Sequence, residues 1–131
     1  MFGKKAQPPI KGLLAQGCRI EGRLVFAEGM RIDGEIVGDV HGHPEQSSLL
    51  VISETAVVEG EVRADHVIVN GRVKGPIIAT EVLELQPRAR VEGDIQYRTL
   101  EVHAGASVAG QLNPLPAEEE KPLLKLAASN P

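Results

Sequence analysis

The sequence predicts an all-β protein folded as a right-handed parallel β-helix, or β-solenoid, of about six short rungs. An apolar-x-Gly-x-apolar motif recurs eight times between residues 20 and 112. Charged residues flank most of these glycines, so apolar and polar positions alternate as they do in a strand with one buried face. Longer units also repeat every 16–17 residues, which is too short a period for helical repeats and is typical of a β-solenoid.

The glycines of the short motif share the parity of the buried residues, so they should face inward. An inward residue without a side chain marks a sharp corner, where the backbone can need a positive φ. We therefore expect corners at Gly22, Gly34, Gly38, Gly60, Gly71, Gly75, Gly93 and Gly110.

Three longer units align without gaps over thirteen residues, and each has alanine at its seventh position. They are Leu50–Val62, Leu83–Ile95 and Leu100–Leu112. Val67–Ile77 fits the same unit if two residues are deleted. The units that start at 50, 67, 83 and 100 are therefore predicted to lie one above another, 17, 16 and 17 residues apart.

The earlier rungs are less regular. Leu24–Ile36 is predicted to follow the same register, with Met30 in the alanine position, and residues 41–48 are predicted to be an insertion. Gly12–Leu24 supplies a still earlier turn, in which Cys18 is expected to be a small core residue. A left-handed hexapeptide helix needs 18 residues per turn, so the shorter period favours the right-handed form.

The repeats divide the chain into three parts. Residues 12–112 form the predicted β-helix, and residues 1–11 and 113–131 are expected to be flexible tails. The tails are rich in proline and charge, and such segments bury too little apolar surface to offset the entropy of ordering.

Composition argues against several functions. The 131-residue chain has a net charge of -4, three aromatic residues and one cysteine. An acidic chain without stacking platforms is a poor partner for nucleic acid, and one cysteine excludes a disulfide framework or a Cys-cluster zinc site. Nucleotide-binding and nucleophile-elbow motifs are absent. We therefore expect no catalytic, cofactor or metal site.

Histidines keep two alternatives open. His41 and His43 lie in the predicted insertion and offer two imidazoles, where a metal site needs three or four ligands. His66 and His103 lie in or beside strands, as would the histidine of a trimeric hexapeptide-repeat acyltransferase or small binding protein, which is the main alternative to a structural role.

The repeats carry a family resemblance. The segments IEGRLVF, MRIDGEIVGDV, SETAVVEGEV, VIVNGRVKGPI and VLELQPRARVEGDI resemble those of bactofilins over about residues 18–112. The resemblance implies a bacterial cytoskeletal scaffold that forms filaments without nucleotide, often at the inner membrane, and gathers cell-wall or morphogenesis proteins. Family members commonly have Phe in the last rung, where this chain has Val108.

The open ends of a β-helix independently suggest polymerisation. Each end exposes unpaired strand edges, and neither flank of the repeat contains a convincing capping helix. End-to-end contacts are therefore expected in the terminal rungs. The candidate residues are Leu13, Leu14 and Ile20 at the N-terminal end, and Leu100, Val102, Val108 and Leu112 at the C-terminal end.

The first residues suggest a membrane contact. Met1 and Phe2 could insert into a bilayer while Lys4 and Lys5 meet anionic head groups. One such segment binds weakly, but a filament would present many of them. With no export signal, the protein is expected in the cytoplasm, at the inner face of the cell membrane.

Overall fold

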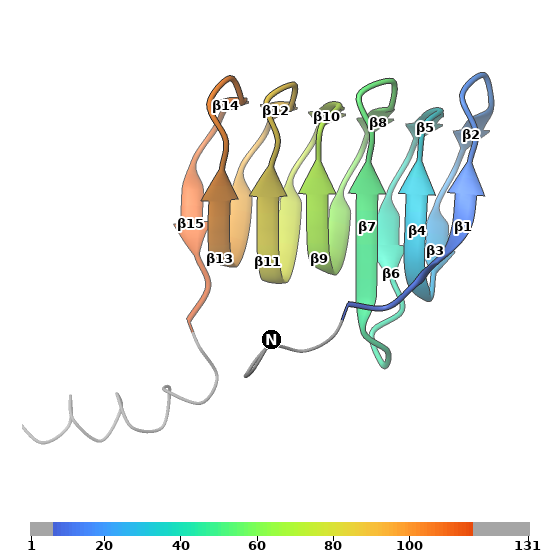
Figure 1. The fold of residues 1–131 in the computed structure, drawn as a ribbon, viewed down its shortest axis with the longest axis horizontal. Coiled ribbons are helices and arrows are strands. Elements are labelled where there is room, and N and C mark those ends of the chain that lie inside the picture. Colours follow the sequence, from blue (N-terminus) through green and yellow to red (C-terminus); the bar gives the residue numbers. More distant parts are fainter. Residues whose placement is uncertain (1–6, 117–131) are drawn as a thin grey trace, which may run out of the picture.

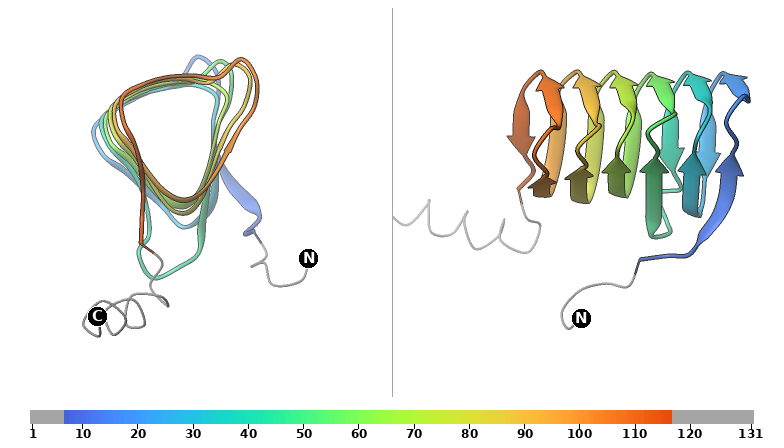
Figure 2. Two further views of the ribbon diagram at one scale, coloured as in Figure 1. Left: turned by 90° about the vertical axis from the view of Figure 1, so that its left-hand side faces the viewer. Right: turned by 45° about the horizontal axis from the view of Figure 1, so that its top comes forward.

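The computed structural model describes residues 7–116 and shows a right-handed parallel β-solenoid of about six turns. Each turn rises along the front, crosses the top and descends at the back while the chain advances toward its C-terminus (Figure 1). Viewed along its axis, the solenoid is a three-sided prism (Figure 2). The predicted fold class and hand are confirmed.

Each turn contributes to a front, a top and a back face, named from Figure 1. The front face begins with β1 (Ile10–Leu14), β4 (Glu28–Ile32) and β7 (Ser48–Ile52). The top face is a six-stranded sheet of β2 (Arg19–Glu21), β5 (Glu35–Val37), β8 (Val57–Glu59), β10 (Arg72–Lys74), β12 (Arg90–Glu92) and β14 (Ser107–Ala109).

The back face contains β3 (Leu24–Phe26), β6 (Val40–Gly42) and, at the C-terminal end, β15 (Leu112–Pro114). Three longer strands bend around the corner and contribute to both the back and the front face: β9 (Val62–Val69), β11 (Ile77–Leu85) and β13 (Ile95–Val102). In the second turn residues 43–47 separate β6 from β7, so the predicted insertion interrupts what is a continuous strand in later turns. β1 and β15 extend two residues beyond the expected ends of the repeat.

Inward side chains form columns that run the length of the prism, and three of these columns, one from each face, define the turns. The front column is Leu14, Ile32, Ile52, Val69, Leu85 and Val102. The top column is Ile20, Ile36, Val58, Val73, Val91 and Val108. The back column is Leu24, Val40, Val62, Ile77, Ile95 and Leu112. A further front column contains Met30, Leu50, Val67, Leu83 and Leu100.

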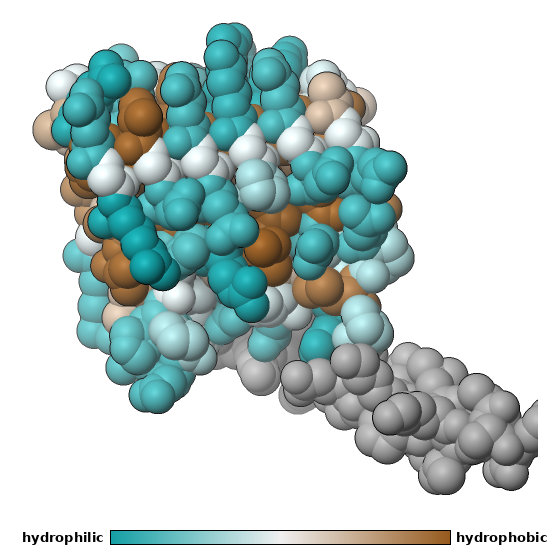
Figure 3. Space-filling view, turned by 180° about the vertical axis from the view of Figure 1, so that it is seen from behind, coloured by the Kyte–Doolittle hydropathy of each residue, from teal (hydrophilic) through white to brown (hydrophobic). Residues whose placement is uncertain are grey.

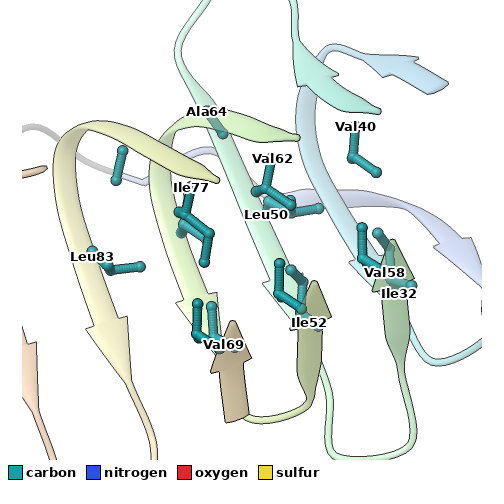
Figure 4. Packing of buried hydrophobic residues seen from close by; sticks show 14 of the residues in the cluster. Ile32, Val40, Leu50, Ile52, Val58, Val62, Ala64, Val69, Ile77 and Leu83 are labelled. Atoms are coloured by element: carbon teal, nitrogen blue, oxygen red, sulfur yellow. The ribbon is translucent and has the colours of Figure 1, made fainter. Parts of the chain in front are cut away.

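The columns pack against one another inside the prism and make the hydrophobic core (Figure 4). In the three columns that define the turns, every member that lies between two other rungs is almost completely buried. Stacking branched aliphatic side chains in this way removes most of their apolar surface from water, which is the main favourable contribution to the fold.

The stacking confirms the predicted period in the C-terminal half, where Leu50, Val67, Leu83 and Leu100 are aligned in adjacent strands. The prediction for Leu24–Ile36 was wrong. Met30 pairs with Leu50, and Leu24 pairs with Val40 instead. The cause is the corner between the front and top faces, which has two lengths.

The long form of this corner spans six residues between the front and top columns, as from Ile52 to Val58, and makes a hydrogen-bonded turn that contains alanine. The short form spans four residues and contains Gly34 or Gly71 instead. A Cβ atom on Gly34 would meet the carbonyl oxygens of Ala15 and Cys18 in the previous turn. The glycine therefore allows the short corner to lie tightly beneath the long one.

The corner between the top and back faces is uniform. Its glycines are Gly22, Gly38, Gly60, Gly75, Gly93 and Gly110, and all have positive φ. From Gly38 onward, a Cβ atom would overlap the carbonyl oxygen of the preceding glycine in this series, which we call the glycine ladder. The expected corners are thus found, but Gly34 and Gly71 belong to the other corner and have no positive φ.

Candidate assembly surfaces at the two ends

The N-terminal end of the prism exposes the first member of each core column. Leu14, Ile20 and Leu24 are only half-buried, whereas their neighbours one rung away are completely buried. β1, β2 and β3 are each hydrogen-bonded to a strand on one side only. Among the described residues, this end therefore combines apolar side chains with a free strand edge, a combination that favours the addition of further strands.

Sequence analysis placed Leu13 at this end and missed Leu24. Leu13 is 60% exposed and takes the outward position that is aligned with Arg31, so it lies on the outer surface of the front face. Leu24 was missed because the incorrect register assigned it to the second turn. The motif Ile20-Glu-Gly22-Arg-Leu24 contained the signal, because it matches Val58-Glu-Gly60-Glu-Val62 residue by residue.

Cys18 also lies at this end. It occupies the same turn position as Ala56, as predicted, and its amide donates a hydrogen bond to the Ala15 carbonyl as that of Ala56 does to Ser53. Its expected burial was wrong, since Cys18 is exposed and Ala56 is buried. No rung precedes Cys18 in the described chain, so nothing covers it.

The C-terminal end exposes the last member of each column. Val102 is 52% exposed and Leu112 is 44% exposed, and Val108 and Leu100 are half-buried. β14 pairs with β12 and β15 pairs with β13, each on one side only. All four residues predicted for this end are thus placed in the last rung, with their side chains in core columns that stop there.

The outer surface is different in character. Seen from behind, it is mostly hydrophilic, with small separate apolar patches (Figure 3). Exposed ion pairs such as Arg19–Glu21 and Arg31–Asp33 lie on the outside of the prism. Hydrogen bonds from the Ser53 hydroxyl and the Arg31 guanidinium hold the pKa of Asp33 below its ordinary value of 3.8.

The four histidines singled out in the sequence occupy four different environments. His41 lies between Arg23, whose guanidinium is 2.9 Å from Nδ1, and Glu61, which is 2.8 Å from Nε2. Because arginine can only donate, Nδ1 is the acceptor and Nε2 carries the proton that it donates to Glu61. Both ring nitrogens are therefore engaged, and His43 accepts a hydrogen bond from the Glu45 amide, so the structure does not pair these two imidazoles.

His66 and His103 are not equivalent either. His66 is buried, and within the described chain neither ring nitrogen has a hydrogen-bond partner, although the Glu81 carboxylate lies 3.9 Å away. His103 is partly exposed and contacts Glu84 and Glu101. The residues proposed to contact a membrane, Met1, Phe2, Lys4 and Lys5, lie outside the described residues. Residues 7–116 contain no helix that could cross a membrane.

These features define a class of protein: a short parallel β-solenoid in which, within residues 7–116, the core is open at both ends and the terminal strands are free to pair. The chain belongs to the bactofilin family, because residues 12–113 match the sequence pattern of that family, which is described as polymer-forming cytoskeletal.

Two bactofilins of Myxococcus xanthus (strain DK1622) are similar to this chain. Bactofilin BacO is 33% identical over 97 residues, which cover 68% of this chain and 77% of BacO. Bactofilin BacP is 31% identical over 119 residues, which cover 86% of this chain and 48% of BacP, so the match spans about half of BacP. No solved structure gave a significant match.

Proposed function

We propose that this protein is a cytoskeletal scaffold that assembles end to end into filaments without nucleotide. The observation that carries the proposal is the exposure of each core column at its two ends alone. Stacking one molecule on another would bury the terminal side chains and pair the free strands, as happens between rungs inside the prism. The family description supports a structural role over the acyltransferase alternative.

Replacing apolar side chains at the ends with charged ones tests this proposal. Val108→Arg and Leu112→Arg place a charge in the C-terminal contact, and Leu14→Arg does so at the N-terminal end. Ile78→Arg is the matched control, because Ile78 points outward from an interior rung. We expect filaments of the unmodified protein and of Ile78→Arg in negative-stain electron microscopy, and no filaments of the end variants. Filaments of normal length from all three end variants would refute end-to-end assembly.

The same variants distinguish two filament geometries. If identical ends meet, blocking one end leaves dimers joined through the other; if unlike ends meet, blocking either end leaves monomers. Sedimentation of Leu14→Arg and Leu112→Arg measures which particle remains. As a control, the circular dichroism spectrum of each variant verifies that it is folded.

We also propose that the filaments lie at the inner face of the cell membrane and position cell-wall or morphogenesis proteins. The supporting feature for the membrane is the sequence Met1-Phe2-Gly3-Lys4-Lys5, which joins an apolar start to two cations. Repetition along a filament would convert a weak contact into stable attachment. Deleting residues 2–5 should abolish co-sedimentation of filaments with anionic vesicles, and unchanged co-sedimentation would refute this membrane contact.

A further inference from the structure

Three metal-type ligands converge on the front face near the C-terminal end. Glu84 in β11 and Glu101 in β13 are aligned on adjacent strands, and His103 follows β13. His103 Nε2 lies 3.0 Å from Glu84 Oε2 and 3.7 Å from Glu101 Oε2. One ligand atom from each of the three side chains lies within 4.8 Å of the others.

The charges of this cluster call for a cation. Two carboxylates directly opposite each other on neighbouring strands repel, which destabilises the pair. Among the described residues, the ion-pair partner of both carboxylates is His103. On the N-terminal side of the cluster, Glu84 is aligned with the apolar Ile68 of β9, so this position of the preceding rung supplies no positive charge.

The donor geometry fits a small divalent transition metal ion. An imidazole nitrogen and two carboxylate oxygens are ligands that zinc accepts at about 2.0–2.2 Å, which places tetrahedral ligand atoms roughly 3.3–3.6 Å apart. The observed separations of 3.0 and 3.7 Å are close to this spacing. Solvent would supply the fourth ligand, because all three side chains are at least partly exposed.

Neighbouring groups already orient the ligands. The Gln86 side-chain amide donates a hydrogen bond of 3.3 Å to Glu84 Oε2. The backbone of His103 is fixed on both sides, because its amide donates to the Leu85 carbonyl and its own carbonyl accepts from the Ala106 amide. Such outer contacts hold metal ligands in place and reduce the entropy lost when the ion binds.

The other histidines of the described chain lack this arrangement. Both ring nitrogens of His41 are used by Arg23 and Glu61. His66 has one carboxylate nearby, that of Glu81 at 3.9 Å, and belongs to no group of three metal-type ligands among the described residues. We propose that Glu84, Glu101 and His103 form a binding site for a divalent transition metal ion such as zinc, which links β11 to the last rung. The proposal does not depend on filament formation.

Equilibrium dialysis of the full chain, first stripped with a chelator and then exposed to micromolar zinc chloride, tests the site. Dialysis followed by elemental analysis works equally well on monomers and filaments. We expect one zinc ion per chain for the unmodified protein and for the control His43→Gln, which removes an imidazole outside the cluster. Glu84→Gln/Glu101→Gln and His103→Gln should bind at least about tenfold more weakly.

A second measurement separates metal binding from a structural effect of the substitutions. Zinc should raise the unfolding temperature of the unmodified protein but not that of Glu101→Gln, whose exposed side chain can be changed without disturbing the core. If the unmodified protein retains no zinc, or if the cluster variants retain as much as the control, the proposal is refuted. His103 would then only form ion pairs with Glu84 and Glu101.

Discussion

The interior rungs and the terminal rungs are built from the same columns of residues, yet they differ in how completely their inward side chains are buried. Val69 and Val102 occupy the same column; Val69 is fully buried and Val102 is 52% exposed. The difference arises from position alone, because an interior rung has a neighbour on both sides and a terminal rung has one. Each rung of a solenoid is therefore an incomplete unit, and its stability depends on what is stacked on it.

The glycine ladder offers the largest expected effect. Gly75→Ala places a methyl group against the Gly60 carbonyl at a φ of 146°, so we expect a loss of more than about 3 kcal/mol in the free energy of unfolding. Gly22→Ala, at a φ of 130° in the first rung, meets no atom within 4 Å and should cost only about 1–2 kcal/mol. Chemical denaturation measures both.

The Gly22 variant also sharpens the proposal for assembly. In the ladder the added methyl group points toward the preceding rung, so at Gly22 it points out of the N-terminal end. Gly22→Ala should therefore remain folded and still impair filament formation if another molecule stacks there. Equal losses of stability in Gly22→Ala and Gly75→Ala would show that the backbone conformation, and not the neighbouring rung, dominates the cost.

Truncation of the matched valines should have the next largest effect. Val69→Ala removes two buried methyl groups and leaves a cavity, with an expected loss of about 2–3 kcal/mol. Val102→Ala should change the stability of the isolated molecule by less than about 1 kcal/mol, because half of its side chain is already in water. Measurement must use a non-polymerising background, such as Leu112→Arg, since stacking would bury Val102 and make the two losses similar.

Asp39 and Asp94 give the smallest expected difference in the free energy of unfolding between an interior and a terminal position. Asp39 Oδ1 accepts a hydrogen bond of 2.9 Å from the Glu61 amide inside the molecule, and Asp94 Oδ1 accepts one of 3.0 Å from the Gln111 amide near the C-terminal end. Asp39→Ala should cost about 1–2 kcal/mol and Asp94→Ala about 0.5–1 kcal/mol, because the second bond is exposed to water. Denaturation of both variants measures the difference, and a larger loss for Asp94→Ala would contradict it.

The candidate end surfaces could be predicted largely from the sequence. Leu14, Ile20, Val102, Val108 and Leu112 were identified because the repeat shows which residues face inward and where the repeat stops. Leu13 was misassigned to the end because its neighbour Leu14 is also apolar, and only one of two consecutive strand residues can face the core.

The metal-ligand cluster was not found in the sequence. Glu84 and Glu101 are 17 residues apart and come together only when adjacent turns are stacked in the correct register. His103 was noted, but as a candidate for the acyltransferase alternative and not as a metal ligand. A search for carboxylates separated by one repeat period would have found Glu84 and Glu101, and His103 lies two residues after Glu101.

The sequence by itself determined the all-β solenoid, its period in the C-terminal half and the inward positions, because alternation and repetition are local properties of a chain. Only the tertiary structure decided the register of the second turn, the exposure of Cys18 and the grouping of Glu84, Glu101 and His103. These depend on which turn lies next to which. The two forms of the front corner differ by two residues. The sequence shows this deletion in Val67–Ile77, but in the second turn only the strand pairing reveals it.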